Sequence, residues 1–137
     1  MIRSLALSAL LAAVASFPAR ADDPGTLAVA LRAAAARDWP AASGQAARSG
    51  PLAQSVIEWQ RLRDGEGSFA DYRGFLDTHP DWPGLPLLRK KGEDKAAGQD
   101  PAAVVAYFSA QPPQTGTGSL AYAAALSAQG QDQAAAK

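Results

Sequence analysis

Residues 51–63 read PLAQSVIEWQRLR and contain the clearest helical pattern of the chain. Large apolar side chains recur there at offsets of 0, 4, 7 and 10, which is the spacing of one face of an α-helix. Pro51 suits the first position of such a helix, because the backbone N–H that proline lacks has no helical partner there. The residues that form this face are Leu52, Val56, Trp59 and Leu62.

Similar start and stop signals lie on both sides of this segment and predict a series of short helices. Asp23-Pro24 and Asp100-Pro101 each place a capping carboxylate before a proline at the first helical position. Ser68 is suited to cap a helix that ends before His79-Pro80. No segment shows the alternating pattern of a strand. We expect helices to begin near residues 24, 40, 51, 68, 82, 101, 119 and 131.

The tripeptide Asp-Trp-Pro occurs twice, at residues 38–40 and 81–83, which are 43 positions apart. We expect its aspartate to cap a helix in both places, and we expect the helix that follows Asp81 to end at Gly98. Residues 112–118 contain two prolines and two glycines and are expected to form a loop.

The composition favours an all-α fold with a thin core. Alanine accounts for 33 of the 137 residues; it is the strongest helix former, and its small side chain lets helices approach closely. Residues 120–130 are similar to the first helix of a tetratricopeptide hairpin, closed by Gly130, and an eighth helix is expected over 131–137. We therefore predict an α-solenoid, or superhelix, of about seven or eight helices in short antiparallel hairpins.

Length, charge and residue types exclude several kinds of chemistry. The chain has 13 basic and 13 acidic side chains, so a polybasic arm for nucleic acid is not expected. Because it has no cysteine, it has no disulfide framework, no cysteine-ligated zinc and no thiol nucleophile. A single histidine leaves no histidine-rich metal cluster. We predict no cofactor and no metal site.

Residues 1–21 have the features of a cleavable secretory signal. Arg3 precedes a run of apolar or small residues over 5–17, which is too short to span a bilayer comfortably. Ala19-Arg20-Ala21 fits a small-x-small cleavage site. We expect export to the periplasm, no membrane anchor after cleavage, and a mature domain over 22–137 with 11 basic and 13 acidic side chains.

Most of the carboxylates are expected to lie at helix caps or on polar helix faces. Glu58 is the most interesting one, because it lies between Ile57 and Trp59 on an otherwise apolar helix. It has two interpretations: a direct functional role, or pairing with Arg61 or Arg63, which the helical spacing favours.

Three further features have a structural and a functional interpretation. His79 is suited to contact the last carbonyl groups of its helix, and metal ligation is the alternative. The basic run 89–91 fits a solvated helix face better than a polyanion site. Gly116 and Gly118 lack the strand, helix and lysine of a phosphate-binding loop. No residue is assigned as catalytic.

A series of short motifs nevertheless resembles a known family. In order and spacing, they are similar to the N-terminal superhelical region of soluble lytic murein transglycosylases. The resemblance covers roughly residues 50–130. The motifs are SVIEWQRLR at 55–63, FADYRGFL at 69–76, HPDWPG at 79–84, LLRKKGE at 87–93, VAYF at 105–108, Pro112, Thr115-Gly116 and GSLA at 118–121.

The resemblance implies a function for a longer protein. Members of this family are periplasmic enzymes that cleave the β-1,4 bond between N-acetylmuramic acid and N-acetylglucosamine in peptidoglycan. A glutamic acid protonates the leaving oxygen, and the muramyl C6 hydroxyl closes a 1,6-anhydro ring in place of attacking water. Their catalytic module is a C-terminal lysozyme-like domain, and their superhelix helps to form a ring through which glycan passes.

This chain contains neither the glutamate-serine nor the Gly-Leu-Met-Gln motif of that catalytic domain. The sequence therefore predicts the N-terminal part of a truncated superhelix, with glycan strands as the partner of the whole enzyme and no lytic activity of its own. The alternative is a non-enzymatic periplasmic helical-repeat adaptor that binds protein or glycan. The coding sequence after Lys137 distinguishes the two.

Overall fold

The structure, a computed structural model, describes residues 24–136, and the expected signal segment lies outside this range. The described residues form eight helices and no strand, which confirms the all-α prediction. The helices are α1 (Pro24–Ala35), α2 (Trp39–Ser49), α3 (Pro51–Arg63), α4 (Phe69–Thr78), α5 (Leu85–Glu93), α6 (Pro101–Ser109), α7 (Gly116–Ala128) and α8 (Asp132–Ala135).

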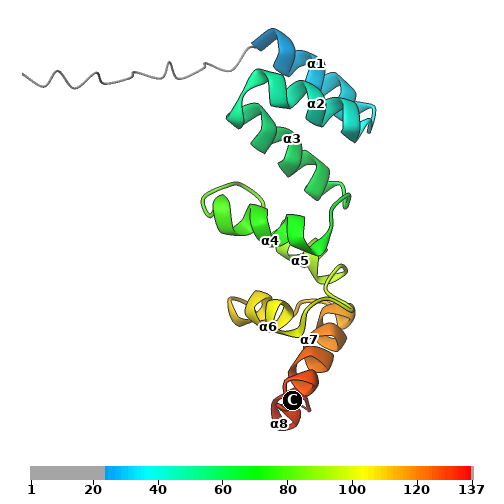
Figure 1. Ribbon diagram of the computed structural model, residues 1–137, viewed down its shortest axis with the longest axis vertical. Coiled ribbons are helices and arrows are strands. Elements are labelled where there is room, and N and C mark those ends of the chain that lie inside the picture. The colour runs from blue at the N-terminus through cyan, green and yellow to red at the C-terminus, as the bar shows by residue number, and fades with distance from the viewer. Residues whose placement is uncertain (1–23, 137) are drawn as a thin grey trace, which may run out of the picture.

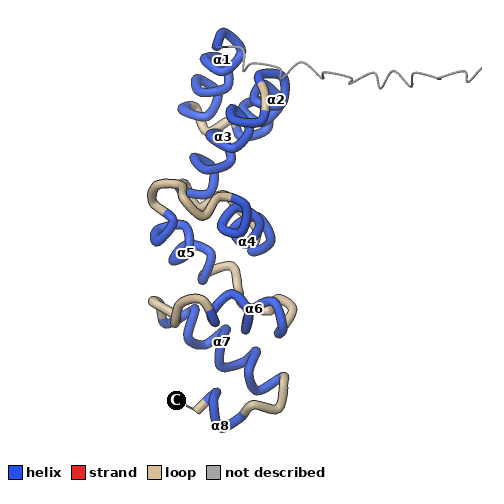
Figure 2. Tube along the Cα trace, turned by 90° about the vertical axis from the view of Figure 1, so that its left-hand side faces the viewer, coloured by secondary structure: helices blue, strands red, loops and turns tan. Residues whose placement is uncertain are grey.

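The helices are stacked along one long axis. In Figure 1, α1–α3 lie at one end, α4 and α5 in the middle, and α6–α8 at the other end. The view at right angles in Figure 2 shows the same elongated order. Packing is mainly between helices that are close in sequence, such as α1 with α2 and α6 with α7. Each helix therefore has few neighbours against which to bury its apolar face.

Alanine forms most of the core at the α1–α3 end. Ile57 is the one large side chain among the fully buried apolar residues there. Because alanine has only a methyl group, the three helices can pack at short range. The buried alanines are Ala30, Ala34, Ala42, Ala46 and Ala53.

Aromatic rings form most of the core in the rest of the stack. Phe69 meets Tyr107 edge to face, with ring centroids 5.1 Å apart, and Tyr107 meets Phe108 in the same way at 5.2 Å. Such edge-to-face pairs gain energy beyond the area that they bury. These rings hold α4 against α6, so a few large side chains replace the broad core of a globular domain.

Several helix starts follow the predicted caps. The side chains of Asp38 and Asp100 each accept a hydrogen bond from the backbone N–H three residues later, at 3.1 and 2.9 Å. Ser68 and Asp71 form a reciprocal capping box at the start of α4. The helix ends at Thr78, before His79-Pro80, as predicted. The expected cap at Asp23 lies outside the described residues.

The second Asp-Trp-Pro tripeptide does not start a helix, so the prediction for Asp81 is wrong. The fifth helix begins at Leu85, after Gly84 in the left-handed conformation at φ +75°. A right-handed helix cannot continue through that conformation. Trp82 is instead held in the turn by ring contacts with Trp59 and Phe75.

Three other helix boundaries also differ from the prediction. The fifth helix ends at Glu93 rather than Gly98, because the backbone after it forms hydrogen bonds that span only three residues. The expected loop over 112–118 is shorter, because α7 already begins at Gly116. The eighth helix is a single turn, Asp132–Ala135, which follows the predicted turn at Gly130 with its φ of +73°.

Tyr72 predicts a loss of stability at alkaline pH. Its side chain is 0% exposed, its hydroxyl donates to the carbonyl of Leu62 at 2.8 Å, and burial raises its pKa from 10.0 to about 12. Between about pH 10 and about pH 12 the hydroxyl of Tyr72 therefore keeps its proton in the folded state, whereas the unfolded chain releases it. We expect the free energy of unfolding to fall by about 2 kcal/mol as pH rises from about 10 to about 12.

Urea unfolding followed by circular dichroism at several pH values measures this loss. Burial also raises the pKa of Tyr107, so Tyr72→Phe should remove part of the pH dependence and leave the contribution of Tyr107. An unaltered pH dependence in Tyr72→Phe would contradict the assignment.

Candidate functional site

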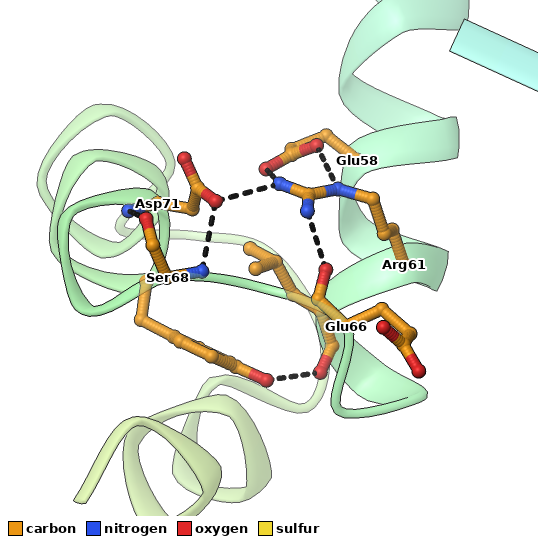
Figure 3. Close-up of polar contacts among 7 residues, drawn as sticks. Glu58, Arg61, Glu66, Ser68 and Asp71 are labelled. Carbon is orange, nitrogen blue, oxygen red and sulfur yellow. Dashed lines mark hydrogen bonds and ion pairs between the residues drawn. The ribbon is translucent and has the colours of Figure 1, made fainter. Parts of the chain in front are cut away.

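Glu58 lies on α3 and binds Arg61, as the helical spacing predicted. Its two carboxylate oxygens accept hydrogen bonds from Nε and Nη2 of Arg61 at 2.9 and 2.7 Å. Arg61 also reaches Asp71 of α4 at 2.9 Å and the backbone carbonyl of Glu66, as Figure 3 shows. The guanidinium therefore joins α3, the loop after it and the start of α4.

The charges of this network stabilise one another. The hydrogen bonds that Arg61 donates to Glu58 raise the pKa of Arg61, burial opposes this, and the hydrogen bond to Asp71 raises it further. Burial acts to raise the pKa of Asp71, but the hydrogen bonds from Ser68 and Arg61 bring it below its usual value. Each oxygen of Glu58 accepts a hydrogen bond from Arg61, so the carboxylate is one half of an ion pair within its own helix. The network acts as a link between helices.

His79 contacts the end of its own helix and also α3. Its Nδ1 lies 3.3 Å from the carbonyl of Phe75, which confirms the predicted contact with the last carbonyl groups. Its Nε2 lies 3.0 Å from Oγ of Ser55, and its ring stacks on Phe75 at 4.2 Å. The Ser55 hydroxyl also bonds to the carbonyl of Pro51 at 3.1 Å, so the serine is tied to its own helix. The contact joins α3 to α4.

The basic run 89–91 does not form a single charged face. Lys90 is exposed, whereas Arg89 and Lys91 are partly buried. The guanidinium of Arg89 lies 5.6 Å from the ring centroid of Tyr107, whose hydroxyl donates to the carbonyl of Arg89. The run therefore fulfils the prediction of a solvated face only in part, because Arg89 turns towards α6.

Glu93 is a buried carboxylate that the sequence pattern did not reveal. It is 1% exposed and accepts hydrogen bonds from the backbone N–H groups of Gln114 and Thr115 and from the hydroxyl of Thr115, at 2.6–3.0 Å. None of the ion pairs among residues 24–136 involves it. The N-terminus of α7, where a helix attracts negative charge, therefore binds a carboxylate of the chain itself.

Gly118 allows this contact. A Cβ at this position would lie 2.4 Å from Oε2 of Glu93, and the N–H of Gly118 donates to the hydroxyl of Thr115 at 3.0 Å. Gly116, by contrast, has open space around it. One of the two glycines is thus required by an internal carboxylate. In the sequence, the glycine at position 118 was the only sign of this close contact.

Two of the surface grooves of the described residues differ in chemical character. One, of about 440 Å³, has an apolar wall from α7 that includes Leu120, whose side chain is 74% exposed. The other, of about 390 Å³, is polar and is lined in part by Arg37, Trp39, Arg63 and Asp64. Arg37 adopts the left-handed conformation at φ +60° and binds Asp64 at 2.8 Å, so its charge is already matched.

Replacing Gly118 tests how tightly the Glu93 contact is packed. We expect Gly118→Ala to lower the free energy of unfolding by about 2 kcal/mol, because the new methyl group displaces a carboxylate that backbone groups hold in place. Gly116→Ala is the matched control and should be neutral or slightly stabilising, since its surroundings are open. Equal urea-unfolding midpoints for the two variants would contradict this account.

Removing the charge of Glu93 tests its hydrogen bonds. Glu93→Gln keeps the shape but presents an amide N–H₂ group to backbone N–H donors, so we expect a loss of about 2–3 kcal/mol in unfolding free energy. Asp94→Asn is the control, because Asp94 is exposed and accepts one hydrogen bond, from Thr117. It should change stability by about 0.5 kcal/mol or less. A milder effect at Glu93 than at Asp94 would argue against a structural role.

The described residues contain no group of three or more acidic or histidine side chains that could hold a metal ion. Within the same residues, no helix is long and apolar enough to cross a membrane. No protein-family model matches the sequence, and no curated protein or solved structure shows significant similarity to it.

Proposed function

We propose that the chain is the N-terminal scaffold region of a periplasmic lytic transglycosylase that acts on peptidoglycan. The observation that carries the proposal is that the motifs of the resemblance contact one another. The indole N–H of Trp59 in the first motif donates to the carbonyl of Pro83 in HPDWPG at 2.9 Å. Motifs that are separate in the sequence therefore share one structural purpose, the joining of successive helices.

Two further contacts follow the same rule. Arg89 in LLRKKGE is linked to Tyr107 in VAYF, and Glu93 of the same motif binds Thr115, at the start of the last motifs. Side chains that bond to the backbone of a neighbouring helix need fixed identity and spacing. The residues that resemble the family are therefore the ones that join the helices, which supports a shared helical scaffold.

The proposed arrangement is an α-solenoid, in which helices stack on their sequence neighbours. The stacked order in Figures 1 and 2 and the packing between nearby helices support it. A solenoid presents a long surface without needing a broad core. In the proposed enzyme this surface guides glycan strands, and the 1,6-anhydro ring closure occurs in a lysozyme-like domain outside these residues.

A periplasmic adaptor is the second candidate, and the groove beside Leu120 favours it. That groove of about 440 Å³ is lined mostly by small apolar side chains, and the leucine at its edge is 74% exposed. An exposed apolar groove of this kind suits a helix or peptide of a partner protein. In an adaptor, the contacts that join the helices would have the same structural role, and the surface would bind a partner instead of guiding glycan to a catalytic domain.

Muropeptide analysis tests the proposed function. The complete product of the gene is incubated with purified sacculi, and the soluble products are separated and weighed by mass spectrometry. We expect 1,6-anhydromuramyl products from the complete protein and none from the 137-residue chain, because the proposed catalytic module is a separate lysozyme-like domain. A zymogram on murein allows the same comparison, with lytic activity seen as cleared bands.

The outcomes separate the candidates. Reducing-end muramyl products from the complete protein would indicate a hydrolase and overturn the proposal. No soluble product from the complete protein would favour the adaptor. Clearing by the chain alone would show that its own residues carry the chemistry. Glu58→Gln in the chain is the control, because it removes the carboxylate that the sequence placed on an apolar helix face.

A further inference from the structure

Two arginines from different helices line the same small pocket. Arg73 of α4 and Arg89 of α5 both border a space of about 150 Å³. Its apolar side is formed by Leu76 of α4, Ala106 of α6 and Ala110 just after α6, and the buried Tyr107 also borders it. The pocket therefore lies where α4, α5 and α6 meet, and its two charges come from 16 positions apart in the sequence.

Neither guanidinium has an acidic partner within ion-pairing distance. The ion pairs among residues 24–136 use Arg37 and Arg61 as their cations. Arg73 lies over the ring of Phe69 at 5.8 Å and has no hydrogen bond to another described residue, while Arg89 has one long contact of 3.5 Å to the carbonyl of Tyr107. Most of their N–H donors remain available.

The aromatic rings behind the arginines orient them. A guanidinium that lies over a ring uses its flat face for that contact and keeps its N–H edge for hydrogen bonds. Arg89 lies 5.6 Å from the centroid of Tyr107, whose hydroxyl is fixed by the carbonyl of Arg89. Two guanidinium groups that line one pocket can donate to the two oxygens of a carboxylate, which arginine binds well.

Asp77 lowers the positive charge of the pocket and so determines which anions it favours. It also lines the pocket, is exposed, and lies beyond 4.0 Å from both guanidinium groups, since no ion pair joins them. The local charge is therefore +1. A singly charged anion neutralises this charge. A dianion such as phosphate would leave one negative charge unbalanced and would be repelled by the aspartate.

We propose that this pocket is a binding subsite for a carboxylate group carried by a larger ligand. Its volume of about 150 Å³ corresponds to about five water molecules, which is enough for a carboxylate and its first carbon atoms. The alanines Ala106 and Ala110 would contact those carbons. The site is independent of the proposed cell-wall function, because it rests only on the arginines, the aspartate and the shape of the pocket.

Titration with acetate tests the proposal. The chain is labelled with ¹⁵N, and the Nε–Hε signals of its arginines are followed as sodium acetate is added at constant ionic strength. We expect saturable shifts at Arg73 and Arg89 and a smaller, linear response at the exposed Arg48. Inorganic phosphate at the same ionic strength should bind more weakly than acetate.

Three variants sharpen the test. Arg89→Gln should weaken acetate binding, read at Arg73, by about tenfold, because half of the donor pair is lost. Lys90→Gln removes the same charge from an exposed neighbour and should change the affinity by less than about twofold. Asp77→Asn should raise the affinity for phosphate more than that for acetate.

Several results would overturn the proposal. Linear shifts at both arginines would indicate only general screening by ions. Equal effects of Arg89→Gln and Lys90→Gln would show that charge, and not the pocket, attracts acetate. Tighter binding of phosphate than of acetate would show that a carboxylate is not the preferred ligand. The Asp77→Asn variant alters an exposed side chain, so it remains informative if Arg89→Gln fails to fold, as judged by circular dichroism.

Discussion

Successive helices in this protein are joined by side chains that bind the backbone of a neighbouring segment. Tyr72 donates to the carbonyl of Leu62, Trp59 donates to that of Pro83, and Glu93 accepts from the N–H of Thr115. Each of these bonds satisfies a backbone group at the end of a helix or in a loop, where it has no helical partner. These directional bonds join segments from α3 to α7, where few side chains are available to fix how one helix lies on the next.

Aromatic residues contribute both a large buried area and a polar group to this arrangement. The rings of Tyr72 and Tyr107 lie in the core, while their hydroxyl groups bond to the backbone of other segments. In a thin stack, one such side chain does what several aliphatic residues do in a broad core. Removing either hydroxyl deletes a hydrogen bond to the backbone of another segment.

The candidate residues show where sequence reasoning succeeded and where it could not. Glu58 and Arg61 are three positions apart on one helix, so their contact followed from helical geometry alone. Arg73 and Arg89 lie on different helices, and nothing in their spacing shows that they share a pocket. Glu93 looked like an ordinary carboxylate on a polar helix face, because the groups that bind it lie 21 and 22 positions later.

Local patterns were sufficient for the all-α class, for most helix starts, and for the caps at Asp38, Ser68 and Asp100, because these depend on interactions within about four residues. Tertiary packing decided the rest. The same Asp-Trp-Pro tripeptide caps a helix at Asp38 but not at Asp81, because Trp82 packs against Trp59 and Phe75 and holds the chain in a turn. The buried Glu93 and the arginine pocket arise in the same way, because they require residues that only the folded chain brings together.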